Sequence, residues 1–241
     1  MLIYKVLLVS AIALEFVFVP LFLKAMWPKK TKKSLVLKMV CTALFISVGF
    51  LAVKISGNTT AFASLMLWGL VLGGVGDFFL HAGSNPAFFI VGLASFLAGH
   101  ICYISAFWWA IKQYFPEVGF VSPAEIAAIV TIYAAFVGYS FYKHIDFGVA
   151  LVPVILYAAT LITMFVKASS LGFRLAAASI PNAGLICVIL VAGSLQFLMS
   201  DSLWANINFN GHKKNRPMKN ANIITYFGAQ VLLACTILVI S

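Results

Sequence analysis

Charge is what this sequence has least of. Only 9% of its 241 residues are Asp, Glu, Lys or Arg, and 63% are hydrophobic. A soluble domain carries roughly 25% charged residues. This chain therefore has too few polar groups to cover a water-facing surface, and its mean hydropathy of +1.06 agrees with that conclusion. The composition excludes an ordinary soluble globular protein and predicts one embedded in a lipid bilayer.

Acidic residues are scarcer than basic ones. The chain has six Asp and Glu against 16 Lys and Arg, which gives a formal net charge of +10. Such an excess can indicate a nucleic-acid partner. Here, however, the basic residues gather in short segments between apolar runs, where they set topology or contact anionic lipid headgroups. We expect the bilayer, and no nucleic acid, as the partner of these charges.

Residues that bind metals are few and dispersed. The four cysteines, Cys41, Cys102, Cys187 and Cys235, lie inside apolar runs without metal-like spacing, so we interpret them as packed thiols. The four histidines, His81, His100, His144 and His212, lie on separate predicted elements. The sequence has no HExxH motif, no P-loop and no serine nucleophile elbow. We therefore predict no metal and no cofactor.

Apolar runs of about 20 residues, the length of a transmembrane helix, follow one another along the whole chain. They predict an all-α, polytopic membrane helix bundle of about eight helices, forming a single transmembrane domain over residues 1–241. The first run is long enough to span and a basic segment follows it, so we do not interpret it as a cleavable signal peptide. Segment 168–181 either extends the seventh run or forms a re-entrant piece. The predicted spans are 3–23, 35–55, 61–81, 87–110, 122–142, 147–166, 182–206 and 221–240.

The distribution of Lys and Arg predicts the orientation of these spans. Five basic residues fall on the side of the second, fourth and sixth loops and the termini: Lys5, Lys54, Lys112, Lys167 and Arg174. We therefore expect the odd-numbered loops to be cytoplasmic and both termini to be non-cytoplasmic, in a multi-pass protein of a bacterial inner membrane or a eukaryotic internal membrane. The odd-numbered loops carry ten: Lys24, Lys29, Lys30, Lys32, Lys33, Lys143, Lys213, Lys214, Arg216 and Lys219.

Three acidic residues lie inside predicted spans, namely Glu15, Asp77 and Asp201. An ionisable group there is costly, and function is the default hypothesis for it. The alternative is a structural ion pair, such as Asp77 with Lys38. No clear motif surrounds Glu15, so its role stays open.

Asp77 has the stronger case for a catalytic role. It lies in the last turn of its predicted helix, where the macrodipole disfavours a negative charge, and burial disfavours the charged form as well. Both effects favour a protonated acid. Two carboxyl groups in unlike environments are the usual apparatus of acid–base hydrolysis. His81 shares the helix face of Asp77 but lies near the membrane boundary, which favours a headgroup or solvent contact.

Depth brings several polar residues to one level of the membrane. Lys38, Asp77, Asp201 and Tyr226 each lie about one turn from the same boundary, within roughly 5–8 Å of a common plane. His100 and Tyr103 lie deeper. Because charges inside a membrane usually face the bundle interior, we expect these groups to converge on one cavity. The glycines at 69, 73 and 76 form a small-residue stripe, which predicts close helix packing.

Five segments in register resemble the YhhN-type lysoplasmalogenase family of integral membrane proteins. The resemblance covers roughly residues 35–240 and rests on the order and spacing of the motifs. They read GLVLGGVGDFFL, FFIVGLASFLAGHICYISAF, PVILYAATLITM, GSLQFLMSDSLWANINF and YFGAQ.

The resemblance implies an enzyme that hydrolyses the vinyl ether bond of lysoplasmalogens, giving a fatty aldehyde and a glycerophospho-choline or -ethanolamine. A lysophospholipid would then be the substrate. Asp77 and Asp201 would be the acid–base pair, with Asp77 as the acid on the helix-end argument, and Lys38 or His81 would contact the phosphate. The polar positions that match the family are Lys38, Asp77, His100, Tyr103, Ser200, Asp201, Asn206, Tyr226 and Gln230.

Two other classes of protein stay open at this point. Buried Asp, His and Tyr residues also form proton relays in transporters. A short parallel echo between GDFFLHAGSN and SDSLWANINFN, four spans apart, is compatible with a transporter repeat. A lipid-binding scaffold with structural buried charges is the third reading. Solute flux in liposomes would indicate the transporter, and ligand-induced stabilisation without turnover would indicate the scaffold.

Overall fold

The structure, a computed structural model, describes residues 1–83 and 85–240. Over these residues the chain forms eight α-helices, one 3-10 turn and no strand, and all eight helices are long and apolar enough to cross a membrane. The predicted all-α bundle of eight spans is confirmed. The elements are α1 (Leu2–Ala25), α2 (Lys32–Ser56), α3 (Ala61–Ala82), α4 (Pro86–Tyr114), α5 (Pro123–Tyr142), η1 (Gly148–Ala150), α6 (Leu151–Ala177), α7 (Ala183–Phe209) and α8 (Arg216–Val239).

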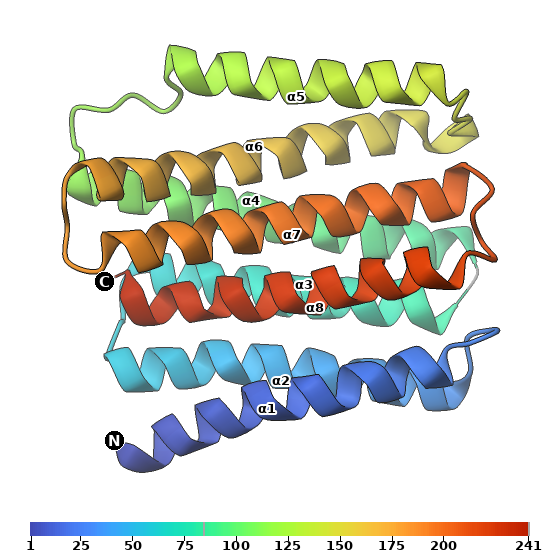
Figure 1. Ribbon diagram of the computed structural model, residues 1–241, viewed down its shortest axis with the longest axis horizontal. Coiled ribbons are helices and arrows are strands. Elements are labelled where there is room, and N and C mark those ends of the chain that lie inside the picture. The colour runs from blue at the N-terminus through green and yellow to red at the C-terminus, as the bar shows by residue number, and fades with distance from the viewer. Residues whose placement is uncertain (84, 241) are drawn as a thin grey trace.

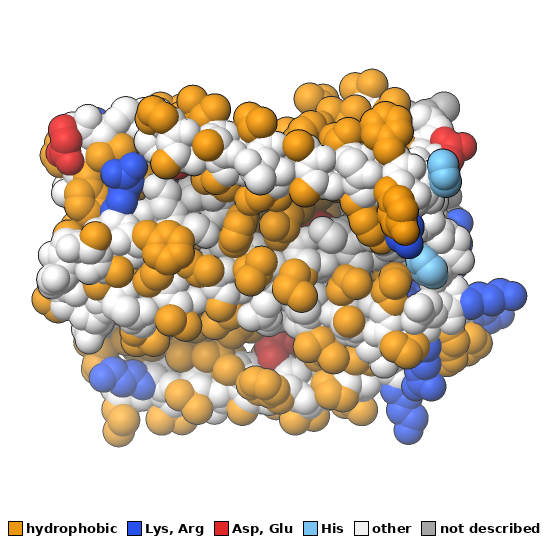
Figure 2. Space-filling model, turned by 45° about the horizontal axis from the view of Figure 1, so that its top comes forward, with side chains coloured by type: hydrophobic (Ala, Val, Ile, Leu, Met, Phe, Trp, Pro, Cys, Tyr) orange, Lys and Arg blue, Asp and Glu red, His pale blue; other side chains and the backbone are white. Residues whose placement is uncertain are grey.

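Successive helices run in alternating directions along the bundle, and both termini lie at one end of it (Figure 1). The connections α1–α2, α3–α4, α5–α6 and α7–α8 therefore meet at the opposite end. We call it the basic end, because the lysines of residues 29–33 and 213–219 lie there. Figure 2 shows Lys and Arg side chains gathered at this end and apolar side chains over the flanks of the bundle. That the basic end faces the cytoplasm stays a prediction.

Local signals explain most helix boundaries. Thr31 and Ser34 form a capping box at the start of α2, and Ser122 and Glu125 form another at the start of α5. Gly57 ends α2 in the left-handed conformation, at a φ of 68°. The Asn215 side chain accepts a hydrogen bond from the Met218 backbone N–H, so α8 begins five residues before the predicted position 221.

Segment 168–177 belongs to α6, and the expectation that it extends the seventh span or re-enters the membrane is wrong. The helix continues because this stretch still buries a face. Leu171 is fully buried, and a Cβ on Gly172 would lie 3.1 Å from the Cα of Cys187 on α7. Lys167, which we had placed among the loop charges, lies inside the same helix and is also buried.

The glycine stripe of α3 gives neighbouring side chains their space, as predicted. The ring of Tyr103 from α4 occupies the position that a Cβ on Gly69 would take. A Cβ on Gly73 would lie 2.7 Å from Nε2 of Gln230, and one on Gly76 would lie 2.6 Å from the ring of Phe96. Larger residues at these positions would displace the side chains of Tyr103 and Phe96 on α4 and of Gln230 on α8.

Helix α5 is the least embedded element. Within residues 1–83 and 85–240 its backbone lies close to that of α6 alone, with one side-chain hydrogen bond from Tyr139 to Asn206 on α7, and Figure 1 shows it at the edge of the bundle. Of its side chains, all of them described, only that of Glu125 is buried. Glu125 forms an ion pair with Lys167, with 2.9 Å between Oε2 and Nζ. Lys167 also donates to the carbonyl of Phe120 and lies 5.4 Å from the ring centroid of Trp108. This buried pair anchors α5 to α6.

We expect the Lys167→Met substitution to lower the apparent unfolding temperature, measured in detergent, by about 10 °C. The change leaves a buried carboxylate without its cation, which costs about 3–5 kcal/mol, and each kcal/mol corresponds to a few degrees in a chain of this size. The double variant Glu125→Gln with Lys167→Met should recover most of the loss, because glutamine keeps the capping box and removes the charge. A single variant as stable as the wild type would show that the pair does not anchor α5.

Candidate active site

A cavity of about 670 Å³ opens within the bundle towards the basic end. All eight helices contribute to its wall, which is mainly apolar. Its volume is that of a site for a small molecule or a lipid headgroup region. Both intramembrane aspartates of the central helices, Asp77 on α3 and Asp201 on α7, line it. The structure therefore brings together two groups that the sequence placed only at a common depth.

Asp77 is fully buried and held by three donors. Oδ1 lies 2.8 Å from Nζ of Lys38 on α2. Oδ2 accepts hydrogen bonds from the hydroxyls of Thr42, at 2.9 Å, and Tyr226, at 2.8 Å. Oδ2 thus accepts two hydrogen bonds, and Oδ1 faces the ammonium of Lys38, which also donates to the Asp77 backbone carbonyl over 3.3 Å. This arrangement fixes the orientation of the Asp77 carboxyl group and gives it a cationic partner.

A chain of hydrogen bonds extends from Asp77 into the core. Nε2 of Gln230 donates to the hydroxyl of Tyr226 over 3.1 Å, and the hydroxyl of Tyr103 donates to Oε1 of Gln230 over 2.9 Å. Tyr226 and Gln230 lie one turn apart on α8, while Tyr103 comes from α4. The predicted residues Tyr103, Tyr226 and Gln230 therefore act as one network that orients the Asp77 carboxylate.

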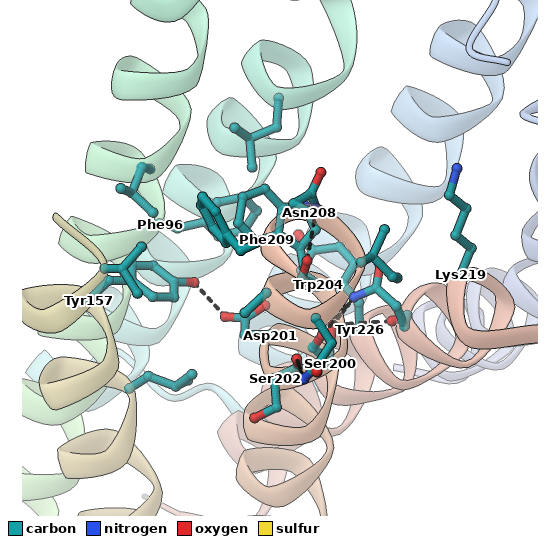
Figure 3. A pocket seen from close by; sticks show the side chains of 18 of the residues that line it. Phe96, Tyr157, Ser200, Asp201, Ser202, Trp204, Asn208, Phe209, Lys219 and Tyr226 are labelled. Carbon is teal, nitrogen blue, oxygen red and sulfur yellow. Dashed lines mark hydrogen bonds between the residues drawn. The ribbon is translucent and has the colours of Figure 1, made fainter. Parts of the chain in front are cut away.

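Asp201 has a different environment. The hydroxyl of Tyr157, on α6, donates to its Oδ2 over 2.5 Å, as Figure 3 shows. Among the described residues no Lys or Arg forms an ion pair with it. Asp201 is also more exposed to the cavity than Asp77. A carboxyl group in an apolar wall without a cation is cheaper to keep protonated than ionised.

The helix-end argument for Asp77 as the acid considered only the dipole of α3. The Lys38 ammonium comes from another helix, and at 2.8 Å it outweighs the partial charge of a helix end. Asp77 therefore has a cationic partner, whereas Asp201 has none among the described residues.

His81, on α3, and His100, on α4, lie in different surroundings. Nε2 of His81 lies 2.8 Å from the Ser34 hydroxyl, at the rim of the cavity. His100 is almost fully buried, and neither ring nitrogen has a hydrogen-bond partner among the described residues. Its ring packs 5.2 Å from that of Tyr157 and 4.8 Å from that of Phe197, measured between centroids. His100 thus packs against Tyr157, the hydrogen-bond partner of Asp201.

Ser200 and Asn206 join helices near the cavity. The Ser200 hydroxyl donates to the Asn222 carbonyl over 3.1 Å, and Nδ2 of Asn222 donates to the Ser200 carbonyl over 2.7 Å. These bonds tie α7 to α8 next to Asp201. Oδ1 of Asn206 accepts a hydrogen bond from Tyr139 over 3.0 Å, which links α7 to α5.

Two hydroxyl partners, Thr42 and Tyr157, were missed by sequence reasoning. Thr42 follows Lys38 by one turn on α2, so the pair K-x-x-x-T was a signal that both could meet the same acceptor. Tyr157 lies within the quoted motif PVILYAATLITM, but a lone tyrosine in an apolar helix carries no further signal.

Lysines of the basic end were also missed as site residues. Lys29, Lys30, Lys213 and Lys219 line the cavity, whereas the sequence alone assigns them to topology or to contacts with bilayer headgroups. The Lys30 ammonium donates to the Leu80 carbonyl over 2.6 Å. Desolvation first, and then the positive charges of Lys38 and Lys219, lower the pKa of Lys30 to about 8. Lys38 itself, one of the two expected phosphate ligands, is engaged by Asp77.

Glu15, whose role the sequence left open, is buried on α1. Neither of its carboxyl oxygens has a hydrogen-bond partner among the described residues. It does not line the cavity. Within the described chain, no group of three or more His, Cys, Asp and Glu side chains is placed to hold a metal ion.

An eight-helix bundle with two aspartates lining one mainly apolar cavity defines a multi-pass helical membrane protein with an internal polar site. The comparison with protein families specifies it further. The model of the YhhN family matches residues 32–237, so the chain belongs to the YhhN family. The match begins at the first residue of α2 and leaves out α1. No curated protein and no solved structure matches the chain.

Proposed function

We propose that this protein is a membrane-embedded hydrolase that cleaves the vinyl ether bond of lysoplasmalogens. The products are a fatty aldehyde and a glycerophospho-choline or -ethanolamine. The proposal rests on the resemblance of the chain to lysoplasmalogenases of the YhhN type, and on one structural observation above all. In a single apolar cavity, one aspartate is held as a carboxylate by Lys38 and two hydroxyls, and the other has only a tyrosine hydroxyl as partner.

The first step needs a proton donor. Asp201 transfers its proton to the β-carbon of the vinyl ether, and the π electrons of the double bond form the new C–H bond. The α-carbon and the ether oxygen then share the positive charge of an oxocarbenium ion. The Tyr157 hydroxyl, which donates to Oδ2 of Asp201, stabilises the carboxylate that remains.

The second step needs a fixed negative charge and a base. The Asp77 carboxylate stabilises the oxocarbenium ion electrostatically, as in other hydrolyses that use two carboxyl groups. Water adds to the α-carbon, and its proton goes to the Asp201 carboxylate, which restores the acid. The hemiacetal then collapses as its hydroxyl proton moves to the glycerol oxygen. One water is consumed, and the C–O bond to the α-carbon breaks.

The apolar wall suits the rest of the substrate. Leu93, Leu161 and Leu198 line the cavity on α4, α6 and α7, and side chains of α5 close one side. An alkenyl chain would lie against these residues with its ether at the level of the two aspartates. Excluding bulk water there would strengthen each electrostatic contact and protect the cation from other nucleophiles.

Aldehyde release from a 1-alkenyl lysophospholipid by the purified protein in detergent tests the proposal. We expect a fatty aldehyde from both the choline and the ethanolamine substrate, with no fatty acid from the matched 1-acyl lysophospholipid. Added chelator should leave the rate unchanged. A well-folded protein that releases no aldehyde would contradict the proposal, and solute flux in sealed liposomes would then favour a transporter.

A further inference from the structure

Four lysines line the mouth of the cavity, and together we call them the lysine cluster: Lys29, Lys30, Lys213 and Lys219. They come from three separate segments, namely the α1–α2 loop, the α7–α8 loop and the first turn of α8. Among the described residues none of them forms an ion pair with a carboxylate. Charges that converge without a counter-ion repel one another, and this repulsion contributes to the low pKa of Lys30. An anion would relieve it.

The distance between the cluster and the aspartates suits a glycerol linker. Lys219 and Tyr226 are seven residues apart on α8, which is about 10 Å along the helix axis. Tyr226 contacts Asp77 directly. In a lysolipid, five bonds separate the phosphorus from the first chain oxygen, about 6 Å when extended. Because a lysine side chain covers the remaining distance, a phosphate at the cluster would place the ether bond beside the aspartates.

The cavity offers no counter-charge for the amine of a headgroup. Among the described residues that line it, Asp77 and Asp201 are the acids, and both lie deeper than the cluster. Trp27, the aromatic ring beside Lys219, already faces two protein cations. Nζ of Lys219 lies 5.4 Å and Cζ of Arg216 lies 5.7 Å from its ring centroid. A choline or ethanolamine group at the cluster would therefore find no carboxylate to pair with there.

We propose that the lysine cluster binds the phosphate ester of a lysolipid and that the headgroup amine is not recognised. The ligand class is 1-ether glycerophospholipids with a single chain, whatever group esterifies the phosphate. This inference rests on the proposed function, which supplies the ether-linked hydrocarbon chain of the ligand. It adds that the phosphate is the part of the headgroup that determines affinity. Lys30 lies in the α1–α2 loop, and Lys219 lies in the first turn of α8. We expect the affinity for the phosphate to depend on these two residues.

Binding of non-cleavable 1-O-alkyl analogues to the purified protein tests this without any turnover. The probes are alkyl-glycerophosphocholine, alkyl-glycerophosphoethanolamine, alkyl-glycerophosphate and the phosphate-free alkylglycerol. We expect the three phosphate-bearing probes to bind within about threefold of one another, and alkylglycerol at least about tenfold more weakly, as expected from the loss of charge-assisted contacts. Chain-free glycerophosphocholine should bind weakly.

Variants locate the effect. The double variant Lys30→Gln with Lys219→Gln should lose about tenfold in affinity for the phosphate-bearing probes and keep that for alkylglycerol. Lys54→Gln, an exposed lysine at the opposite end of the bundle, is the matched control. Wild-type affinity for the phosphates should also fall above pH 8 as Lys30 loses its proton, and Lys30→Arg should remove that fall.

Three results would overturn the inference. They are tight binding of the choline probe alone, equal loss for alkylglycerol in the double variant, and chain-free glycerophosphocholine that binds as tightly as the lipids. The last would identify a soluble phosphate ester as the ligand. The proposed function can fail separately, because the probes are not cleaved. A protein with this binding pattern that releases no aldehyde keeps the lysine site and loses the enzymatic proposal.

Discussion

Replacing Asp201 by asparagine is expected to lower kcat for aldehyde release at least about 10³-fold, because general acid catalysis contributes typically 10²–10⁴-fold. Asparagine has the same shape, and its carbonyl oxygen can accept the hydrogen bond of Tyr157 that Asp201 accepts now. It has no acidic proton to give to the vinyl ether. The measurement is aldehyde release under saturating substrate.

Two controls distinguish the loss of the acidic proton from the loss of the folded structure. The variant should keep its apparent unfolding temperature and its affinity for the alkyl-glycerophosphocholine probe. Glu117→Gln, which changes an exposed loop acid at the other end of the bundle, should leave kcat unchanged. If folded Asp201→Asn and folded Asp77→Asn both keep near-full activity, the assignment of the two aspartates to catalysis is wrong.

The lengths of the apolar runs were sufficient to predict the eight spans. Backbone groups in lipid must be satisfied within a helix, so a run of about 20 apolar residues admits one structure. The predicted helix boundaries were wrong where single side chains determine them. The cap formed by Asn215 makes α8 begin earlier than predicted, and the burial of Leu171 lets α6 continue beyond its most apolar part.

Depth was predictable for the candidate site, and lateral contacts were not. Helical rise placed Lys38, Asp77, Asp201 and Tyr226 at one level, and the structure shows all four on one cavity. Which of them pair depends on how helices distant in sequence pack together. Sequence reasoning named an ion pair between Asp77 and Lys38, which the structure shows, but it could not choose that pair over a phosphate contact for Lys38. It gave no reason to join Asp201 to Tyr157, 44 positions away.

The acid–base assignment depended on this missing information. The helix-end argument is sound for an isolated helix, where the last turn disfavours a carboxylate. In the bundle, α2 presents an ammonium and a hydroxyl to the same carboxylate, and α8 presents a second hydroxyl. The contacts of this aspartate are therefore determined by a lysine and a threonine one turn apart on another span, and not by its own position in a helix.

The Lys38→Met variant carries the second large effect that we expect. Without the ammonium, the Asp77 carboxyl group would lose the ion pair that positions it towards the oxocarbenium ion. We expect kcat to fall about 10²–10³-fold, the usual cost of losing a preorganised electrostatic contact. KM should change little, because Nζ of Lys38 already binds Asp77 and its carbonyl and not the phosphate.

The split between kcat and KM makes this prediction specific to positioning. Lys38→Arg keeps a cation beside the Asp77 carboxylate, so we expect that variant to retain most of the wild-type kcat. A phosphate ligand would behave otherwise, because its loss raises KM. A rise in KM with unchanged kcat would thus indicate that Lys38 binds the headgroup phosphate. Asp77 would then lack the support that makes it the fixed carboxylate of the pair.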